Sequence, residues 1–518
     1  MSARLWIGVL MALPLAAGAA EIYSVPACEE RRAAGYEVRV DGAEAPVSAV
    51  RNSAMPVNIR WPGHQRELDQ TEIGGLVRFA FKNTARVSVV APRDFREVKV
   101  RPFAKDVKPI VHGRMVEFSL TKPGAYSVEF DGVHQNLQIF ADAPIDYRVD
   151  PKAKGVIYFG PGEHDAGVIT LKTGETLYID EGAVVFGRVE AKDADHIRIL
   201  GRGILDGSRI KAECVPIDPA LEAEQRRKGF AVTNYRRWDE VLLEYCDDVL
   251  IEGLTIRDSP LYNIRPICCR GLEIRNVKLC GNWRYNSDGI DMHNCENVRI
   301  SDCFVRTFDD AICIKGFDYR MDERKMDHDG YRHDVFTNAV IERCTVWCDW
   351  GNALEFGAET RAREICDITF RDCDLIHTTG NACDVQNCDY ADIHDVRFES
   401  IRIEQDAPFA RITYSASAKD FDPTPVAGRA SRFFAASIHV IPEYSKDGVK
   451  RGQNRNITLS DIRVTGPVAP YLWVDGYDKE HRTTGVTVRG VYWNGKEVSD
   501  LLRRAGATGK FADPPQYE

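Results

Sequence analysis

The chain has no long run of basic residues, and its formal net charge over 518 residues is -10. Binding to nucleic-acid phosphates draws on clustered lysine and arginine side chains. The charge balance therefore argues against a nucleic-acid partner. Hydrophobic residues make up 44% and charged residues 28%, which is the ordinary balance of a globular protein.

A hydrophobic run long enough to span a membrane is also missing. The apolar run from Leu5 to Leu15 follows Arg4 and precedes the small residues Ala17-Gly18-Ala19. It is too short to cross a bilayer and has the pattern of an export signal. We therefore predict a signal peptide over residues 1–20, no membrane span, and a mature protein that is secreted or periplasmic.

Helical periodicity is absent from the main body of the chain, which favours an all-β fold. The chain is too long for one compact core, so two domains or one elongated repeat are expected. In residues 21–148, apolar residues alternate in segments such as Val116-Glu117-Phe118-Ser119-Leu120. This period of two predicts a small antiparallel β-sandwich with a hairpin turn at 121–124. This segment contains no cluster of acidic residues or histidines that would indicate a catalytic site.

Residues 149–518 contain a repeat, in which apolar residues stand at positions 0, +2, +5 and +7. Examples are Val249-Ile251-Leu254-Ile256, Leu272-Ile274-Val277-Leu279 and Val298-Ile300-Cys303-Val305. Successive copies lie 23 to 29 residues apart, except for gaps of 41 and 61 residues. Repeats of this length built from short strands indicate a solenoid. We predict a right-handed parallel β-helix with insertions at 317–336 and 407–454.

The 15 cysteines are an odd number, so complete pairing within one chain is impossible. Cys303, Cys344 and Cys373 occupy a repeat position that is held elsewhere by leucine, valine or isoleucine. A buried free cysteine behaves as a small apolar side chain. We expect these three to stack in the interior, with one or two disulfides elsewhere that the sequence cannot assign.

Acidic and polar residues recur at similar offsets within five successive repeats. Equal offsets in a parallel β-helix lie above one another, about 4.8 Å apart per turn. One wall of the solenoid should therefore carry the three carboxylates of Asp288, Asp309 and Asp310. The substrate-binding candidates expected on the same wall are Arg265, Lys315, Asn352, Glu355, Asp384 and Gln386. Crowded carboxylates should raise at least one pKa, as a general acid requires.

Other residues have structural interpretations that must be weighed. We expect Asp291 and Asp302 to bond backbone amides in turns rather than to take part in chemistry. His293 is open to the same interpretation. Three tryptophans could stack on sugar rings, although packing in the core is at least as common a role for this side chain. They are Trp283, Trp347 and Trp350.

Two motifs resemble those of the polygalacturonases, the family 28 glycoside hydrolases. The segment Asn286-Ser287-Asp288-Gly289 resembles the family's Asn-Thr-Asp-Gly motif, and Asp309-Asp310 resembles its Asp-Asp motif, 21 and 22 residues later. The resemblance implies inverting hydrolysis of a glycosidic bond. It implies that Asp309 is the general acid and that Asp288 and Asp310 activate water.

The sequence departs from that family at the positions that would bind a uronate. Asn352 stands where the family has histidine, and Asp384 and Gln386 stand in place of an Arg-Ile-Lys motif. These residues suit neutral sugar hydroxyls better than a carboxylate. The sandwich followed by a β-helix also resembles the family 49 dextranases. We therefore predict a neutral polysaccharide or oligosaccharide as partner, with no cofactor and no metal.

Three alternatives remain open at this stage. One is a polygalacturonase-type pectin hydrolase, because the basic residues Arg361 and Arg363 are compatible with an acidic substrate. Another is a β-helical polysaccharide lyase, which would release unsaturated products that absorb in the near ultraviolet. The third is a solenoid that binds carbohydrate without catalysis.

Overall fold

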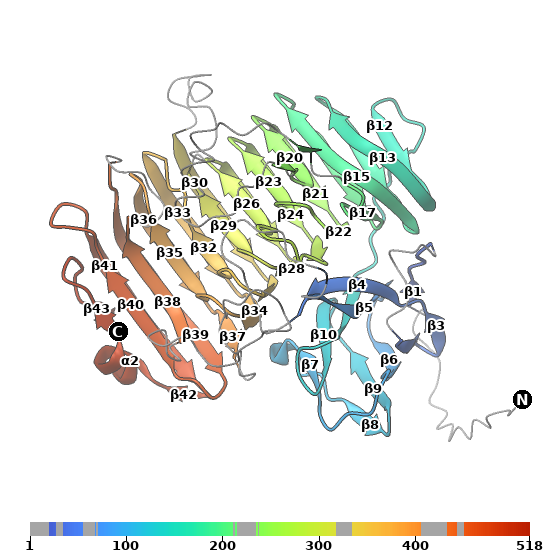
Figure 1. Ribbon diagram of the computed structural model, residues 1–518, viewed down its shortest axis with the longest axis horizontal. Coiled ribbons are helices and arrows are strands. Elements are labelled where there is room, and N and C mark those ends of the chain that lie inside the picture. Colours follow the sequence, from blue (N-terminus) through green and yellow to red (C-terminus); the bar gives the residue numbers. More distant parts are fainter. Residues whose placement is uncertain are drawn as a thin grey trace, which may run out of the picture.

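The computed structural model consists of a β-sandwich followed by a long parallel β-helix (Figure 1). It describes residues 20–26, 35–54, 68, 71–210, 213–214, 235–236, 238–316, 334–405, 433–442 and 450–518. The predicted fold class is confirmed. The expected signal peptide and most of the two expected insertions lie outside the described residues. The predicted boundary at residue 148 falls between the last strand of the sandwich and the first strand of the β-helix.

The sandwich consists of two sheets that enclose a core of alternating apolar side chains. One sheet contains β1 (Glu21–Ile22), β4 (Ser48–Ser53), β5 (Thr71–Ala80), β7 (Val98–Arg101), β10 (Gly124–Phe130) and β11 (Leu137–Asp142). The other contains β2 (Glu37–Val40), β3 (Ala43–Ala45), β6 (Ala85–Val90), β8 (Ile110–His112) and β9 (Met115–Leu120). The pairs are antiparallel except β5 with β11, which is parallel. A 3₁₀ turn, η3 (Phe103–Lys105), follows β7.

The prediction of a hairpin at 121–124 is wrong. β9 pairs with β6 and β8, whereas β10 pairs with β11 and β7 in the opposite sheet. Residues 121–123 thus cross from one layer to the other. Sequence alternation cannot tell the two cases apart, because both strands point their apolar side chains into the same core.

The first face of the β-helix carries the first half of the apolar repeat. Its strands are β12 (Val156–Phe159), β14 (Thr176–Ile179), β16 (Ile197–Gly201), β21 (Asp247–Glu252), β24 (Arg270–Arg275), β27 (Glu296–Ser301), β30 (Val335–Glu342), β33 (Glu364–Arg371), β36 (Asp392–Glu399), β39 (Gln453–Thr465), β41 (Thr483–Trp493) and β44 (Gln516–Tyr517). Each pairs in parallel with the next, so the repeat predicted from the sequence forms one continuous sheet.

The second face carries the +5 and +7 positions. Its strands are β17 (Ile204–Asp206), β22 (Thr255–Arg257), β25 (Lys278–Cys280), β28 (Phe304–Thr307), β31 (Thr345–Cys348), β34 (Asp374–Thr378) and β37 (Arg402–Glu404). The longer strands β13 (Gly162–Leu171) and β15 (Ala183–Lys192) begin the stack. β15 pairs with both β17 and β20 (Val241–Glu244), so it contributes to two faces.

The third face continues from β20. It contains β23 (Ile264–Ile267), β26 (Ile290–His293), β29 (Ile312–Lys315), β32 (Leu354–Phe356), β35 (Cys383–Asn387), β38 (Phe433–Val440), β40 (Pro470–Asp475) and β43 (Ala507–Thr508). A short pair, β18 (Glu213–Cys214) with β19 (Tyr235–Arg236), lies apart from the stack. Near the C-terminus, β42 (Lys496–Glu497) pairs back on β41 and precedes helix α2 (Ser499–Ala505).

Each turn between the first and second faces contains a residue in the left-handed conformation. It stands four residues after the first apolar position, as with Asn276 (φ 53°) and Asp302 (φ 58°). Asparagine, aspartate and glycine tolerate this region best. Asp302 stands in such a turn as expected, but its carboxylate pairs with the Arg343 side chain at 2.8 Å rather than with a backbone amide.

The interior of the β-helix is a single apolar column. Cys303, Cys344 and Cys373 are buried thiols that lie in contact in successive turns, which confirms the predicted stack. The 13 cysteines between Cys246 and Cys388 are all buried free thiols. Phe370 and Phe398 stack with ring centroids 5.2 Å apart and an interplanar angle of 5°.

Buried charges join the sandwich to the β-helix. Arg101 of β7 bonds to Glu129 of the sandwich at 2.9 Å and to Glu404 of β37 at 2.7 Å. His377 of β34 reaches the same Glu129 at 2.7 Å. An apolar cluster that includes Phe140 and Phe304 packs beside them. Among the described residues, no helix is long and apolar enough to span a bilayer.

Candidate active site

Asp288 and Asp310 occupy equivalent positions, two residues before strands β26 and β29 of the third face. The amide of Gly289 donates to the Asp310 carbonyl at 2.9 Å, and the amide of Ala311 donates to the Asn352 carbonyl at 2.9 Å. These bonds put Asp288, Asp310 and Asn352 in one row across three turns. A β-carbon on Gly289 would lie 2.2 Å from the Ala311 carbonyl oxygen, so the motif requires glycine at this close approach.

A second row of polar side chains lies on the strands themselves. Its members in successive turns are Asp291, Cys313, Glu355 and Asp384. All four are almost completely buried. The predicted neighbours Glu355 and Asp384 are thus side by side, as equal offsets indicated.

The offset that placed Arg265 level with Asp288 is wrong. Ile264 pairs with Ile290, so Arg265 is level with Asp291 instead. The connection 281–289 is longer than 258–263, and this shifts the two turns relative to each other. Arg265 forms an ion pair with Asp239 at 3.5 Å and lies over the Tyr262 ring.

Lys315 of β29 lies at the centre of the carboxylates. Its Nζ is 2.9 Å from Asp291, 3.5 Å from Glu359 and 3.7 Å from Asp288. Burial lowers the pKa of Lys315, but the charges of Asp291 and Glu359 outweigh it and raise that pKa well above the usual value. The lysine therefore stays cationic and its charge is shared among three acids.

Two expectations about neighbouring turn residues are wrong. Asp291 is fully buried on β26, where its carboxylate holds Lys315. His293 is also buried on β26, and its Nδ1 lies 3.0 Å from the Gly316 carbonyl oxygen. Both side chains belong to a strand, because the alternation Ile290-Asp291-Met292-His293 turns its apolar members inward and its polar members outward.

The catalytic candidates have strongly perturbed acidities. Burial raises the pKa of Asp288 well above the usual aspartate range, and the nearby Asp291 and Asp309 carboxylates raise it further. Burial likewise raises the pKa of Asp309, with Asp310 adding to the effect. Asp309 accepts hydrogen bonds from the Asp310 amide at 3.1 Å and from the Asn286 side chain at 3.4 Å.

Asp310 and Glu355 share a hydrogen bond. Burial and then the Asp310 charge raise the pKa of Glu355 well above the usual value, so Glu355 is the protonated partner and donates to Asp310. The Asn352 amide also donates to Asp310, at 2.8 Å. Asp310, Cys313 and Glu355 place ligand atoms within 4.8 Å of one another, a set that could hold a metal ion. The shared proton satisfies the carboxylates without one.

The remaining predicted residues lie around this cluster. The side chain of Asn352 accepts a hydrogen bond from the Asn381 amide at 2.8 Å. Gln386 of β35 lies beside His439 of β38 in the sheet register. Burial lowers the pKa of His439 to about 4, so this ring is neutral at neutral pH. Arg361 faces Asp389 at 3.4 Å.

Aromatic side chains border the site. Trp347 and Trp283 are buried and bond to Asp349 and Asp258, so they serve packing. Trp350, immediately before the Gly351-Asn352 segment, is only partly buried. Its ring lies 5.4 Å from that of Phe308 and 5.6 Å from that of Tyr285. Trp350 is therefore the tryptophan of the three with surface left for a ligand.

A separate hollow of about 590 Å³ lies on the first face, over β24 and β27. Arg275, Arg299, Asp302 and Arg343 line it. The three catalytic candidates do not border it. We place the candidate site at the carboxylate cluster, because burial and the neighbouring charges raise the pKa of its carboxyls there.

Sequence reasoning missed Asp291, Glu359 and His439. The strand alternation around Asp291 could have revealed it, because a buried outward-facing carboxylate needs a partner. Glu359 follows β32 outside any repeat position. His439 lies in the stretch 407–454 that we predicted as an insertion, a prediction that is wrong for β38 (Phe433–Val440), which is a strand of the third face. Neither residue stands at a position that the spacing of the repeat would have marked.

Comparison with known proteins supports the assignment of this region. Residues 183–412 match Glycosyl hydrolases family 28. A probable polygalacturonase of Vitis vinifera is 35% identical over 277 residues, which cover 47% of this chain and 54% of that protein. A polygalacturonase of Chamaecyparis obtusa is 24% identical over 120 residues, or 22% of each chain. The chain thus spans only about half the length of the first of these relatives.

A solved structure shares the architecture of both parts. Dex49A from Penicillium minioluteum superposes with a TM-score of 0.59 at 13% identity, covering 96% of each chain. A sequence identity this low supports a similarity of fold only. Residues 183–412 carry the match to family 28, which confirms the resemblance to the polygalacturonase family over that stretch, and the likeness to the dextranase is one of fold.

Proposed function

We propose that this protein is an inverting glycoside hydrolase that cleaves a polysaccharide or oligosaccharide of neutral sugars. The observation that carries the proposal is the gathering of the Asp288, Asp309 and Asp310 carboxyls, of which Asp288 and Asp309 are buried and Asp310 is partly exposed, with the pKa of each raised. Hydrolysis by inversion needs one carboxylic acid that donates a proton and a carboxylate that activates water. Environments that raise carboxyl pKa values supply the acid.

Asp309 is the proposed general acid. Its raised pKa favours the protonated carboxyl, and the proton passes to the glycosidic oxygen as the bond to the anomeric carbon breaks. Asp288 and Asp310 are the proposed bases, which take a proton from the water that attacks the opposite face. Lys315 lies 3.7 Å from Asp288 and favours its ionised form.

The charge of the cluster supports a neutral substrate. Asp291, Glu355 and Asp384 extend the acidic trio along the same strands. Lys315 is already shared by three carboxylates. A uronate entering here would add a negative charge to an acidic, buried surface, which is unfavourable. Asn352 and Gln386 are proposed to bind sugar hydroxyls, and Trp350 to stack on a sugar ring.

Hydrolysis of polygalacturonate is the second candidate. The names of the relatives favour it, above all the probable polygalacturonase that is 35% identical. Either substrate would lie outside the cytoplasm, which accords with the export signal that we predict at residues 1–20.

The test is digestion of a substrate panel by the purified protein. Dextran, pullulan and other neutral glycans are compared with polygalacturonate by release of reducing ends. Turnover of a neutral glycan, with inversion at the first product anomer by NMR, would support the proposal. Turnover confined to polygalacturonate would select the second candidate. Unsaturated products that absorb in the near ultraviolet would indicate a lyase and overturn both.

A further inference from the structure

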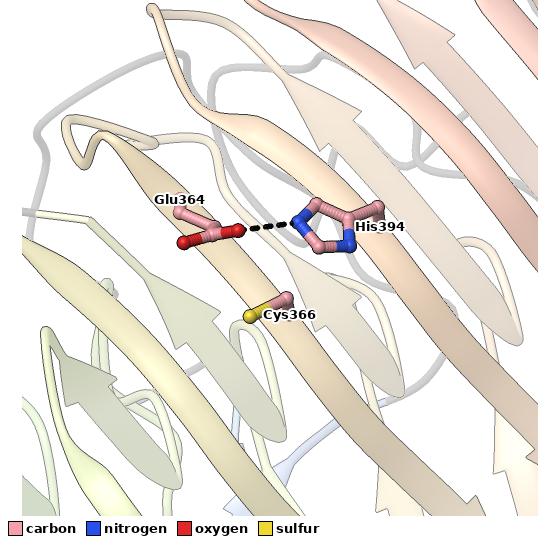
Figure 2. A group of neighbouring side chains, drawn as sticks. All are labelled: Glu364, Cys366 and His394. Atoms are coloured by element: carbon pink, nitrogen blue, oxygen red, sulfur yellow. Dashed lines mark hydrogen bonds and ion pairs between the residues drawn. The ribbon is translucent and has the colours of Figure 1, made fainter.

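Three side chains with metal-binding chemistry gather on the first face of the β-helix, on strands that do not carry the aspartate trio. Glu364 and Cys366 stand two residues apart on β33, and His394 lies beside Cys366 on the neighbouring strand β36. Figure 2 shows the carboxylate, the thiol and the imidazole converging from the two strands. Their ligand atoms all lie within 4.8 Å of one another.

The cluster is built into the surface rather than scattered over it. Cys366 is 6% exposed and His394 is 7% exposed, while Glu364 is partly exposed. The Thr337 hydroxyl on β30 lies 3.3 Å from the Cys366 sulfur. The thiol and the imidazole are thus almost fully shielded from solvent, while the carboxylate keeps part of its surface exposed.

The hydrogen bonding of His394 gives a second, independent observation. Its Nε2 lies 2.7 Å from Glu364, and its Nδ1 lies 2.7 Å from Asp395. A neutral imidazole has one N–H and can donate to only one of these carboxylates. The other contact therefore needs either a second proton or a cation that the free ring nitrogen and its carboxylate bind together.

The bond to Asp395 is the kind that supports a ligating histidine. Metal-bound histidines commonly donate their other N–H to a carboxylate, which fixes the tautomer and aims the free nitrogen at the ion. Arg455 lies beside His394 in the sheet, but its charge is held by Asp392 at 3.1 Å. This neighbouring basic group is therefore already paired with a carboxylate.

We propose that Glu364, Cys366 and His394 form a binding site for a divalent zinc-like cation. A thiolate, an imidazole nitrogen and a carboxylate oxygen are the donors that Zn²⁺ takes, with water as a fourth ligand. Zinc bonds of about 2.0–2.3 Å put tetrahedral ligands about 3.3–3.8 Å apart, so modest side-chain rotation closes the set. The ion would link two consecutive turns of the solenoid. The proposed site is contrary to the sequence-based expectation of no metal.

The experiment titrates chelator-treated full-length protein with Zn²⁺ alone, by calorimetry and by metal analysis after dialysis. One ion per chain is expected. Cys366→Ser and His394→Ala should each weaken binding by more than about 100-fold, because loss of a supporting group alone typically costs about 10–100-fold. Asp395→Asn should fall in that smaller range. Co²⁺ should give a thiolate charge-transfer band that Cys366→Ser abolishes.

Two control variants test whether the ion binds at this cluster or elsewhere on the chain. Cys313→Ser alters the second candidate metal set, and His196→Ala removes a histidine that also lies 2.7 Å from an aspartate, Asp248. Both should leave Zn²⁺ binding unchanged. Glu364→Gln keeps the shape of the cluster if the other variants fold poorly, and it should weaken binding without changing the far-ultraviolet circular dichroism. Absence of stoichiometric binding, or binding lost only in Cys313→Ser, would overturn the proposal.

Discussion

At the scale of single residues, Asp309 and Asp288 differ in what stabilises their charge. Asp288 has Lys315 at 3.7 Å, whereas Asp309 accepts hydrogen bonds from a backbone amide and an asparagine side chain. Both are buried, so neither ionises as readily as a solvated aspartate. Lys315 favours the ionised form of both carboxyls, and Asp288 is the one of the two within ion-pair distance of it, which suits Asp288 to the proposed role of base.

Asp309→Asn should abolish proton donation while preserving shape. Turnover is expected to fall by about 10²–10⁴-fold, the usual contribution of a general acid. Folding and substrate binding should be retained, because the amide has nearly the same volume. Initial rates of reducing-end release and calorimetric binding of substrate measure the two effects. An unchanged rate would rule out Asp309 as the acid and favour a solenoid that binds carbohydrate without catalysis.

Glu355→Gln should alter the dependence of stability on pH. The pKa of Glu355 in the folded protein is raised well above the unfolded value. Its contribution is therefore fully present below about pH 4.3 and is lost as the pH rises through the raised pKa. The variant should match the wild type in melting temperature near pH 4 and exceed it increasingly at higher pH. Scanning calorimetry across pH tests this, and a lower melting temperature at every pH would contradict it.

At the scale of elements, each turn of the β-helix depends on its inward-facing side chains. Phe370 on β33 and Phe398 on β36 stack face to face in the interior, and Phe356 of β32 packs against both edge-on. The apolar repeat in the sequence specifies these positions. The left-handed residues between the first two faces, such as Asn276 and Asp302, specify where the chain turns.

Phe398→Ala should cost about 3–5 kcal/mol of stability, because it leaves a cavity in a closely packed column. Arg397→Ala changes the exposed neighbour on the same strand and should cost less than about 0.5 kcal/mol. Urea unfolding followed by circular dichroism compares the two variants. Equal midpoints would mean that the interior relaxes to fill the space.

The repeat was predictable at this scale because its period is regular. The connection from β9 to β10 was not, because strands that share a core look alike whether or not they pair. Which residues share a row with Asp288 could also be learned only from the structure. Connections of unequal length, 258–263 and 281–289, shift offsets that are counted along the chain.

At the scale of the whole molecule, the sandwich and the β-helix are joined through buried charges. Arg101 bridges Glu129 and Glu404, and its side chain is 1% exposed. Burial raises the pKa of Glu404 to about 7, against the lowering effect of Arg101. The arginine therefore offsets a large desolvation cost for carboxylates on both sides of the junction.

Arg101→Met should destabilise the protein by about 3–5 kcal/mol, because it leaves buried carboxylates without their cation. Arg489→Met breaks an exposed pair with Glu518 and should cost less than about 1 kcal/mol. Denaturant unfolding at neutral pH measures both. Similar midpoints for the two variants would show that the junction does not depend on this arginine.

The sequence by itself determined the β-helix, the interior cysteine stack and the neighbourhood of the aspartate trio. It could do so because a repeat of fixed period places residues with the same or similar offsets on the same face in successive turns. Only the tertiary structure decided that Asp291 and Glu359 share Lys315 and that Arg101 meets Glu404. Glu359 and Glu404 lie far along the chain from their partners, and a side chain's partner is set by which turns and layers the fold brings together.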